Sequence, residues 1–314
     1  MSCGVDINKI FARALDPIHI GAGGYRLGRV DNTIVRDPAT EVPKIPGTSF
    51  AGVVKEFYTL FYTLYLTEKD GSKDKSYEEN RKCAEERVKQ IFGDENRKGK
   101  LRFYDGQIIF FPVPSIQGTV WITTKGICEY WFGEKATVLQ KVDDKTNVDK
   151  AYVIKKSNST IELLNLGWIL LDVEDVSQDN DLISKKIGGW VSQIVVVSEK
   201  LFSHIVNDNL EVRTSVKIDP ETGTAAEGAL FTYEAIPRGT VFGFEIGEEK
   251  LRTTNHNVNE IIEAVAPYFK LLGIGGMGTR GFGRLELCVE DSLLLQNDQH
   301  GQNKQGAPGG EKNA

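Results

Sequence analysis

The sequence predicts an α+β fold built on a ferredoxin-like split βαβ core that carries insertions. Two observations predict it. Apolar residues recur at helical spacing in two separate segments, near residues 50–64 and 261–272, and short β-prone segments flank both. The predicted order is strand, helix, strands, then strand, helix, strands, helix and strand. The chain has 314 residues, and we interpret residues 1–296 as one elaborated domain.

The first predicted strand begins near residue 5 and ends at Asp16-Pro17. A long irregular segment follows, glycine-rich at residues 21–28 and closed by Pro43 and Pro46. Irregular segments of this length in compact domains are usually functional or disordered. This one is therefore a candidate for carrying function.

A core-facing helix is predicted next, with Thr48 or Ser49 as its N-cap. Its apolar stripe consists of Phe50, Val53, Val54, Phe57, Leu60, Phe61 and Leu64. Residues 68–102 are densely charged with both signs mixed, and residues 77–92 favour an exposed helix with opposite charges three or four apart. We interpret this stretch as a solvated insertion.

The middle of the chain favours strands. Residues 107–113 (QIIFFPV) and 118–123 (GTVWIT) predict a pair of strands around a turn near Pro114-Ser115. Residues 134–162 carry many Lys, Asp and Asn, interrupted by β-prone pieces such as residues 151–154, which suggests a protruding hairpin.

The C-terminal half predicts a strand at 194–197, a short helix at 199–206 and a strand that places Val212, Val216 and Ile218 on one face. Residues 230–236 and 240–246 flank the turn at 237–239, an apparent hairpin. A helix with Pro267 inside it, a glycine loop at 273–283 and a final strand at 284–289 follow. Residues 297–314 are rich in Gly, Gln and Asn, so we expect a disordered tail.

The formal net charge of −6 and the pI near 5.5 argue against a free-standing nucleic-acid binder, because phosphate binding usually needs an excess of Lys and Arg. Residues 1–60, however, hold seven basic against six acidic side chains, with Arg26, Arg29 and Arg36 clustered. Local charge there is compatible with RNA.

No apolar run is long enough to span a membrane, and the N-terminus lacks a basic region followed by an apolar stretch. We expect a cytoplasmic protein without a membrane partner. Four cysteines are scattered without CxxC pairs, which favours reduced structural thiols over zinc ligands: Cys3, Cys83, Cys128 and Cys288.

The glycine loop has the sequence GIGGMGTRGFG. Glycines let backbone N–H groups approach an anion closely, and Arg280 can add charge. The loop is not a Walker A motif, because no Gly-Lys-Ser/Thr ends it, and a Rossmann fingerprint would open a helix rather than a strand. By itself the pattern fits a structural turn as well as a phosphate cradle.

Two further residues could carry chemistry. His19, beside the flexible backbone of Gly21, could act as a general base, contact RNA or make a structural hydrogen bond. Asp31 lies in the irregular segment between Arg29 and Asn32, where a carboxylate could ligate a divalent cation, orient a ribose 2′-hydroxyl or form a turn. Neither residue is decisive alone.

Several motifs follow one another along the chain: HIGAG (19–23), LGRVDNTIVR (27–36), PKIPGTSFAGVVK (43–55), the stretches at 106–115 and 218–237, and the glycine loop. Together they resemble the RAMP family of CRISPR systems, and within it the backbone subunits of type III-B (Cmr) complexes. The resemblance covers roughly residues 8–290. It leaves the charged insertion and the tail unmatched.

The resemblance implies a hand-shaped fold with an RRM-like palm that polymerises along a guide RNA, with a thumb hairpin that displaces one guide–target base pair. Residues 134–162 are our candidate for the thumb. The family resemblance also implies that Asp31 is required for cutting target RNA at regular intervals. The cut is expected to need a divalent metal ion, Mg or Mn, and no organic cofactor. Whether Asp31 acts as a metal ligand or as a general base stays open. The implied partners are guide RNA, target RNA, other copies of the chain and other type III subunits.

The resemblance also guides the choice of RNA-binding residues. These are His19, Gly21, Arg29, Asn32, Arg36, Ser49, Lys55, Gly275, Gly276, Gly278, Arg280, Gly281 and Gly283. One departure concerns the start of the first helix, where the family usually has Lys and Arg at the positions of Ala51 and Lys55. Guide contacts there are expected to be weaker or relocated.

Three alternatives compete with an RNA-cutting backbone subunit. The first is a non-catalytic RNA scaffold of the same fold. The presence of Asp31 in its loop favours the enzyme over this alternative. The second is a metal-independent, single-copy guide-processing nuclease with His19 as general base, which self-assembly on RNA would argue against. The third is a nucleotide-binding regulatory protein that uses the glycine loop, which nucleotide titration would detect.

Overall fold

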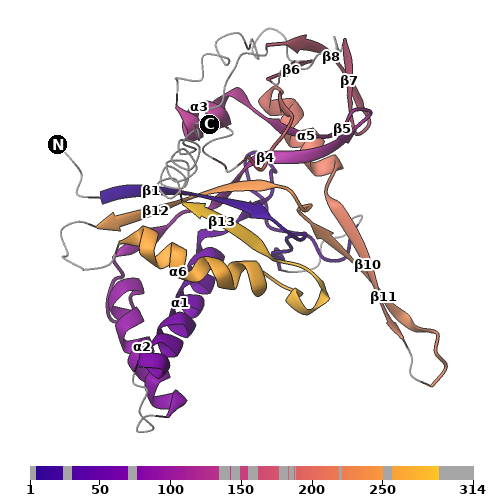
Figure 1. Cartoon of the computed structure of the whole chain (residues 1–314). Helices are drawn as coiled ribbons and strands as arrows, with labels where there is room; N and C mark the ends of the chain where they lie inside the picture. Colours follow the sequence, from indigo (N-terminus) through magenta and orange to yellow (C-terminus); the bar gives the residue numbers. More distant parts are fainter. Residues whose placement is uncertain are drawn as a thin grey trace, which may run out of the picture.

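The computed structural model describes residues 5–23, 30–69, 76–133, 142, 149–154, 162–176, 183, 187, 189–218, 221–249 and 257–289. The described part is α+β, as the sequence predicts. An eleven-stranded mixed sheet forms its centre, and a two-stranded hairpin projects from it (Figure 1). The predicted tail at 297–314 and Arg29 lie outside the described residues.

Four strands and two helices make the split βαβ core. They are β1 (Val5–Ala14), β4 (Gly106–Ser115), β12 (Val241–Glu249), β13 (Leu285–Val289), α1 (Gly47–Lys69) and α6 (Val258–Leu271). Their order in the sheet is β13-β1-β12-β4, with antiparallel neighbours. The strands joined by α1, β1 and β4, are therefore parallel but separated by β12. This confirms the predicted ferredoxin-like arrangement.

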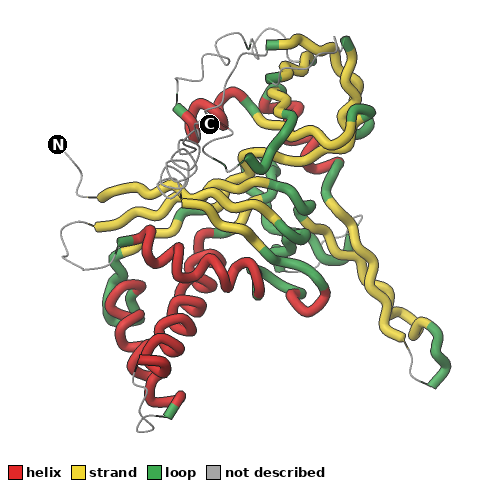
Figure 2. Tube along the Cα trace, in the orientation of Figure 1, coloured by secondary structure: helices red, strands yellow, loops and turns green. Residues whose placement is uncertain are grey.

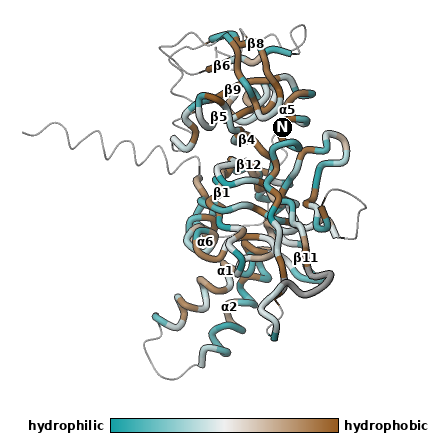
Figure 3. Tube along the Cα trace, turned by 90° about the vertical axis from the view of Figure 1, so that its right-hand side faces the viewer, coloured by the Kyte–Doolittle hydropathy of each residue, from teal (hydrophilic) through white to brown (hydrophobic). Residues whose placement is uncertain are grey.

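Aromatic packing attaches both helices to one face of this sheet. Phe50 of α1 stacks on Phe244 of β12, with ring centroids 4.0 Å apart, and lies 5.5 Å from Phe269 of α6. All three side chains are fully buried. Figure 2 shows α1 and α6 below the strands of this core, and Figure 3 shows apolar residues along both helices. The apolar stripes seen in the sequence are thus the core faces of α1 and α6.

The start of α1 differs from the prediction. The helix begins at Gly47, so neither Thr48 nor Ser49 is its N-cap. The Gly47 N–H donates to Asp105 Oδ1 at 2.8 Å, and a Cβ at Gly47 would lie 2.5 Å from the Phe103 carbonyl oxygen. A carboxylate from a distant loop satisfies this free N–H, which local sequence patterns do not reveal.

The charged insertion forms α2 (Tyr77–Phe92) and β3 (Leu101–Phe103), which pairs with β12. Ser76 and Glu79 make a capping box at the start of α2. The helix is less solvated than predicted, because Ala84, Val88 and Ile91 are buried on the side that packs against α1.

A second set of elements extends the sheet beyond β4. It comprises β2 (Lys44–Ile45), β5 (Gly118–Thr123), α3 (Lys125–Phe132), β6 (Lys150–Val153), β7 (Leu163–Leu166), β8 (Ile169–Asp175), β9 (Ile194–Val196) and α5 (Glu199–Asp208). The predicted β4–β5 pair is confirmed, with Phe111 opposite Ile122. Residues Ile108–Phe111 of β4 are all fully buried, which explains a continuous apolar run instead of an alternating one.

Most of the hairpin predicted at residues 134–162 lies outside the described residues. Residues 150–153 form β6 inside the sheet, parallel to β8 and antiparallel to β9. The predictions for residues 134–141, 143–148 and 155–161 lie outside the described part of the chain. Among the described residues, the element that projects is the pair β10 (Glu211–Ile218) and β11 (Ala225–Ala235), at the lower right of Figure 1.

The predicted pairing of residues 230–236 with 240–246 is wrong. β11 pairs with β10, whereas β12 pairs with β1 from Val5↔Glu249 to Arg13↔Val241. The turn at 237–239 leads from β11 in the hairpin to β12 in the large sheet. Gly239 in this turn donates to the Ala14 carbonyl at the end of β1. In the described ranges, no helix is long and apolar enough to cross a membrane.

Candidate functional site

The irregular N-terminal segment packs against the C-terminal end of β11, near residues 232–236, which we call its base. Ile18 and Ile236 exchange two backbone hydrogen bonds of 2.8 and 2.9 Å. Asn32 donates to the Thr232 carbonyl and accepts from the Glu234 N–H, each at 3.0 Å. Residues 18–23 and 30–36, which have little regular structure of their own, therefore receive their shape from a strand about two hundred positions later.

Asp31 is bound to Thr232 by three hydrogen bonds. Its Oδ2 accepts from the Thr232 backbone N–H and from the Thr232 hydroxyl, each at 2.8 Å. The Asp31 N–H in turn donates to Thr232 Oγ1 at 2.9 Å. These bonds, the one from the Thr232 backbone first, lower the pKa of the Asp31 carboxyl below its usual value. Asp31 is solvent-exposed and ionised at neutral pH.

His19 lies beneath this site and is nearly buried, at 5% exposure. Its Nδ1 lies 2.6 Å from the Glu234 carbonyl oxygen, so Nδ1 carries the proton and donates. Its ring meets that of Tyr233 edge-on, with centroids 5.9 Å apart. The remaining nitrogen, Nε2, lies toward Gly21, where a Cβ would come within 3.4 Å of it.

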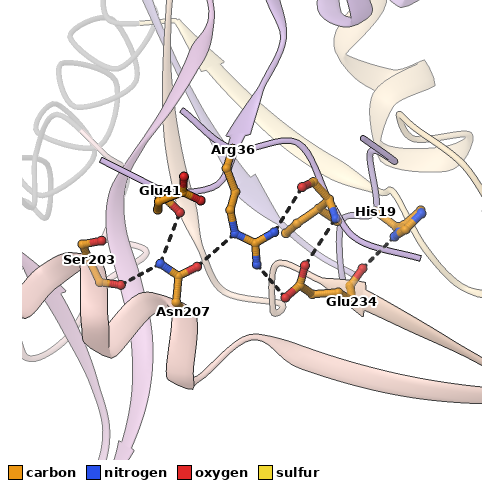
Figure 4. Close-up of polar contacts among 7 residues, drawn as sticks. His19, Arg36, Glu41, Ser203, Asn207 and Glu234 are labelled. Carbon is orange, nitrogen blue, oxygen red and sulfur yellow. Dashed lines mark hydrogen bonds and ion pairs between the residues drawn. The ribbon is translucent and has the colours of Figure 1, made fainter. Parts of the chain in front are cut away.

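Arg36 and Glu234 form the polar centre of the segment (Figure 4). Arg36 Nη2 donates to Glu234 Oε1 at 2.6 Å, and Arg36 Nε donates to the Asn207 side chain on α5 at 3.1 Å. The second carboxylate oxygen of Glu234 accepts from the Ile34 N–H. The side chains of Arg36 and Glu234 are 17% and 10% exposed. The guanidinium of Arg36 is therefore occupied inside the protein.

The glycine loop packs against the other side of His19. The Gly276 N–H donates to the His19 carbonyl at 3.0 Å, and the Gly283 N–H donates to the Pro17 carbonyl at 3.0 Å. Gly275 has φ +86°, and a Cβ there would lie 2.5 Å from the His19 carbonyl oxygen. Gly275 is therefore required by the packing of the loop.

Other glycines of the loop have room around them. A Cβ at Gly276 would make only ordinary contacts, the nearest with His19 Cδ2 at 3.7 Å, and one at Gly278 would lie 3.7 Å from the Leu272 carbonyl oxygen. Gly281 has open space but φ +78°. The loop thus combines a structural role at Gly275 with exposed backbone at Gly276, Gly278 and Gly281.

Arg280 brings a positive charge to the same place. Its Nη1 donates to the Tyr233 hydroxyl at 3.2 Å, and its guanidinium lies 6.0 Å from the Tyr233 ring centroid. Arg280 is exposed. Tyr233 thus lies between His19 and Arg280, and it links the glycine loop to the hairpin strand that holds Asp31.

The structure therefore brings together most of the predicted site residues: His19, Gly21, Asp31, Asn32, Arg36, Gly275, Gly276, Arg280 and Gly283 all lie on or beside the base of β11. Ser49 and Lys55 instead lie on α1, where Lys55 Nζ donates to the Gly93 carbonyl at the end of α2 at 3.4 Å. Thr232, Tyr233 and Glu234 were missed. They lie within the motif at 218–237, but nothing local to the sequence indicates that this strand contacts residues 18–36.

Metal ligands are few here. Among the described residues, no group of three or more His, Cys, Asp or Glu side chains could hold a metal ion. Glu234 is paired with Arg36, so Asp31 is the carboxylate available among the side chains that the structure describes around the base of β11. Mg²⁺ is commonly held by one or two carboxylates together with substrate phosphates. The residues present fit an ion shared between Asp31 and a bound phosphate, but not an ion held by the protein alone.

A groove of about 670 Å³ opens elsewhere, between α3, α5 and the loop before α1. Its lining includes Asp37, Asp105, Glu199 and Glu245, with Lys44 among them. This acidic groove disfavours phosphate, and it contains none of the predicted site residues. The exposed base of the hairpin is therefore the candidate functional site.

Known proteins match nearly the whole chain. The RAMP superfamily matches residues 11–286. A curated relative, the CRISPR system Cmr endoribonuclease Cmr4 of Pyrococcus furiosus, is 26% identical over 299 residues, which cover 88% of this chain and 93% of that protein.

Two solved structures show the same fold. One is a chain of a type III-B Cmr-beta complex bound to cognate target RNA, with a TM-score of 0.66 at 18% identity, covering 92% of this chain and 98% of that one. The other is oligomeric Cmr4 from Pyrococcus furiosus, with a TM-score of 0.52 at 20% identity, covering 90% and 99%.

Proposed function

The chain belongs to the RAMP superfamily, and on this basis we propose that it is the backbone subunit of a type III-B CRISPR complex. In this role it binds guide RNA, polymerises along it with other copies and with other type III subunits, and cleaves complementary target RNA at regular intervals. The relative that matches 88% of the chain is a Cmr endoribonuclease, which supports both the complex and the activity.

One observation carries the catalytic part of the proposal: an exposed, ionised carboxylate at the base of a projecting hairpin. Asp31 Oδ2 is held by Thr232, and among the residues that the structure describes Asp31 Oδ1 has no recorded hydrogen-bond partner. A carboxylate held by one oxygen presents the other in a defined direction. A catalytic group needs such preorganisation.

The surroundings of Asp31 suit an RNA backbone. The exposed glycine loop lets a phosphate approach closely at Gly276 and Gly278, and the guanidinium of Arg280 offers a contact to phosphate oxygens. RNA duplexes are recognised through shape and backbone rather than base edges, so this site needs few cations. An acidic total charge is compatible with the proposal, because polymerisation assembles the RNA groove from several copies.

In the cleavage step the nucleophile and the leaving group both belong to the target RNA, so the protein supplies positioning and charge. The 2′-oxygen of the target attacks the adjacent phosphorus, and the bond from phosphorus to the 5′-oxygen breaks, which leaves a 2′,3′-cyclic phosphate and a 5′-hydroxyl. The 2′-hydroxyl loses a proton and the 5′-oxygen gains one. Asp31 orients the 2′-hydroxyl or binds a metal ion, and its lowered pKa makes it a weak general base. A bound Mg²⁺ or Mn²⁺ would supply charge stabilisation for the phosphorane.

The geometry of His19 argues against the guide-processing alternative. A general base must reach the proton that it removes, but His19 is 5% exposed and its Nδ1 is engaged by the Glu234 carbonyl. Its contacts with Gly276 and Tyr233 support a role in holding the glycine loop against the hairpin.

The sharpest test replaces Asp31 by Asn. Asn keeps an oxygen that can accept from Thr232, so the loop should stay in place while the charge is lost. Target cleavage by the assembled complex should fall roughly a hundredfold or more at every site together, with guide and target binding unchanged. Asp208→Asn, at an exposed position on α5, is the matched control. A regular cleavage ladder at the unmodified rate from Asp31→Asn would favour the non-catalytic scaffold instead.

A further inference from the structure

The hairpin does more than project from the sheet, because one of its side chains holds the Asp31 carboxylate. We propose that Thr232 is a positioning residue for cleavage, which fixes the orientation of Asp31 and ties it to the β10–β11 hairpin. This inference rests on the proposed function of Asp31. It assigns a role to a residue that lies within the motif at 218–237 but was not among the predicted site residues.

The hydrogen-bond geometry is specific to a hydroxyl on this strand. Thr232 Oγ1 donates to Asp31 Oδ2 at 2.8 Å and accepts from the Asp31 N–H at 2.9 Å, so a single hydroxyl holds both ends of the residue. With the backbone bond from the Thr232 N–H, two donors converge on Oδ2. Rotation of the carboxylate would break both of these bonds, and Oδ1 therefore keeps one direction.

A purely structural role for the hydroxyl is the competing explanation. Two backbone hydrogen bonds attach the same segment to β11 without it: Asn32 N–H to the Thr232 carbonyl, and Glu234 N–H to the Asn32 carbonyl, each at 3.0 Å. Ile18 and Ile236 add a second backbone contact. The segment therefore stays attached when the hydroxyl is removed. The Asp31 carboxylate then keeps only the backbone donor of Thr232 and loses the second bond that fixes its orientation.

The position of Thr232 also connects cleavage with the hairpin. In the register of the pair, Thr232 lies opposite Thr214, and Leu230 lies opposite Val216. Residues directly opposite one another in an antiparallel pair point to the same face. Asp31 is therefore held on the hairpin face that carries the exposed side chains of Val216 and Leu230. A displacement of the hairpin would move the carboxylate with it.

The test compares three substitutions in the assembled complex with guide RNA. Thr232→Val keeps the shape and β propensity of Thr and removes the hydroxyl. Thr232→Ser keeps the hydroxyl. Thr214→Val removes the hydroxyl directly across the hairpin, where no bond to Asp31 exists. For each we would measure the single-turnover cleavage rate, the dissociation constant for target RNA and the thermal midpoint of unfolding.

We expect Thr232→Val to lower the cleavage rate roughly tenfold to a hundredfold, the usual cost of losing an outer partner of a reactive group. Target affinity should not change, Thr232→Ser should recover most of the rate, and Thr214→Val should cleave normally. If Thr232→Val cleaves at the unmodified rate while Asp31→Asn does not cleave, the positioning role is wrong and the proposed function stands. If Asp31→Asn also cleaves normally, both the positioning role of Thr232 and the catalytic role of Asp31 are wrong.

Discussion

Arg36 and Glu234 form a 2.6 Å ion pair between the irregular N-terminal segment and the hairpin strand, 198 positions apart in the chain. Both side chains are largely buried, and each has further partners: Arg36 bonds Asn207 and the Ile34 carbonyl, and Glu234 accepts from the Ile34 N–H. Arg36 was predicted from the sequence to bind RNA. Its contacts support a role in shaping the site.

The first prediction concerns this pair. Arg36→Met should lower the free energy of unfolding by about 3–5 kcal/mol, because it leaves the Glu234 carboxylate buried without its partner. The double variant Arg36→Met with Glu234→Gln should recover part of the loss. Chemical denaturation of the isolated chain measures both. A fully stable Arg36→Met protein that binds guide RNA poorly would instead support a direct RNA contact.

A second prediction uses two neighbouring glycines as a matched pair. Gly275→Ala should destabilise the fold, because its φ of +86° is unfavourable for Ala and the new Cβ would lie 2.5 Å from the His19 carbonyl oxygen. Gly276→Leu should leave the fold intact, since space is open there, but should block the approach of phosphate and weaken guide binding. Thermal melting and gel-shift assays separate the effects. Unchanged guide binding by folded Gly276→Leu would favour a purely structural loop.

The third prediction concerns the projecting hairpin. Val216 and Leu230 are 41% and 62% exposed, which is costly for apolar side chains unless a partner covers them. We expect Val216→Ser with Leu230→Ser to leave the monomer folded and guide binding intact, and to change the efficiency or spacing of target cleavage. End-labelled target RNA reports the spacing. A normal cleavage ladder would remove these two side chains from the RNA interface.

The cysteines provide a fourth test. Burial raises the pKa of the Cys128 thiol to about 12 and that of Cys288 to about 11, so neither forms an appreciable amount of thiolate at pH 8. Cys83 is exposed on α2. Iodoacetamide at pH 8 should therefore modify Cys83 well before Cys128 or Cys288 in the native protein, and all of them in denaturant. Peptide mass mapping measures the order, and early labelling of Cys128 would contradict the packing around α3.

Much of the fold follows from local patterns in the sequence. The apolar stripes at residues 50–64 and 261–272 determined α1 and α6, and the continuous apolar run at 107–113 determined a strand covered on both faces. The order of these elements was enough to predict a split βαβ core. Such signals are readable because helical and strand periodicity depend on neighbours within a few residues.

The candidate site was only partly readable. The motifs named Asp31, His19 and the glycine loop, but they did not reveal that Gly275 is required by His19, that Arg36 is buried or that Lys55 lies away from the loop. A residue's type indicates what it can do chemically. Its exposure and partners depend on segments far away in the chain.

The tertiary structure alone decided the partner of β11. The alternation of side chains along a strand is the same whichever strand pairs with it. The sequence therefore predicted that residues 230–236 pair with 240–246 across a short turn. In the fold, β11 instead pairs with β10, and residues 18–23 and 30–36 pack against its base. Asp31 meets Thr232 for this reason. The choice depended on the whole sheet, where β1 occupies one edge of β12 and β3 and β4 occupy the other, so neither edge is open to β11.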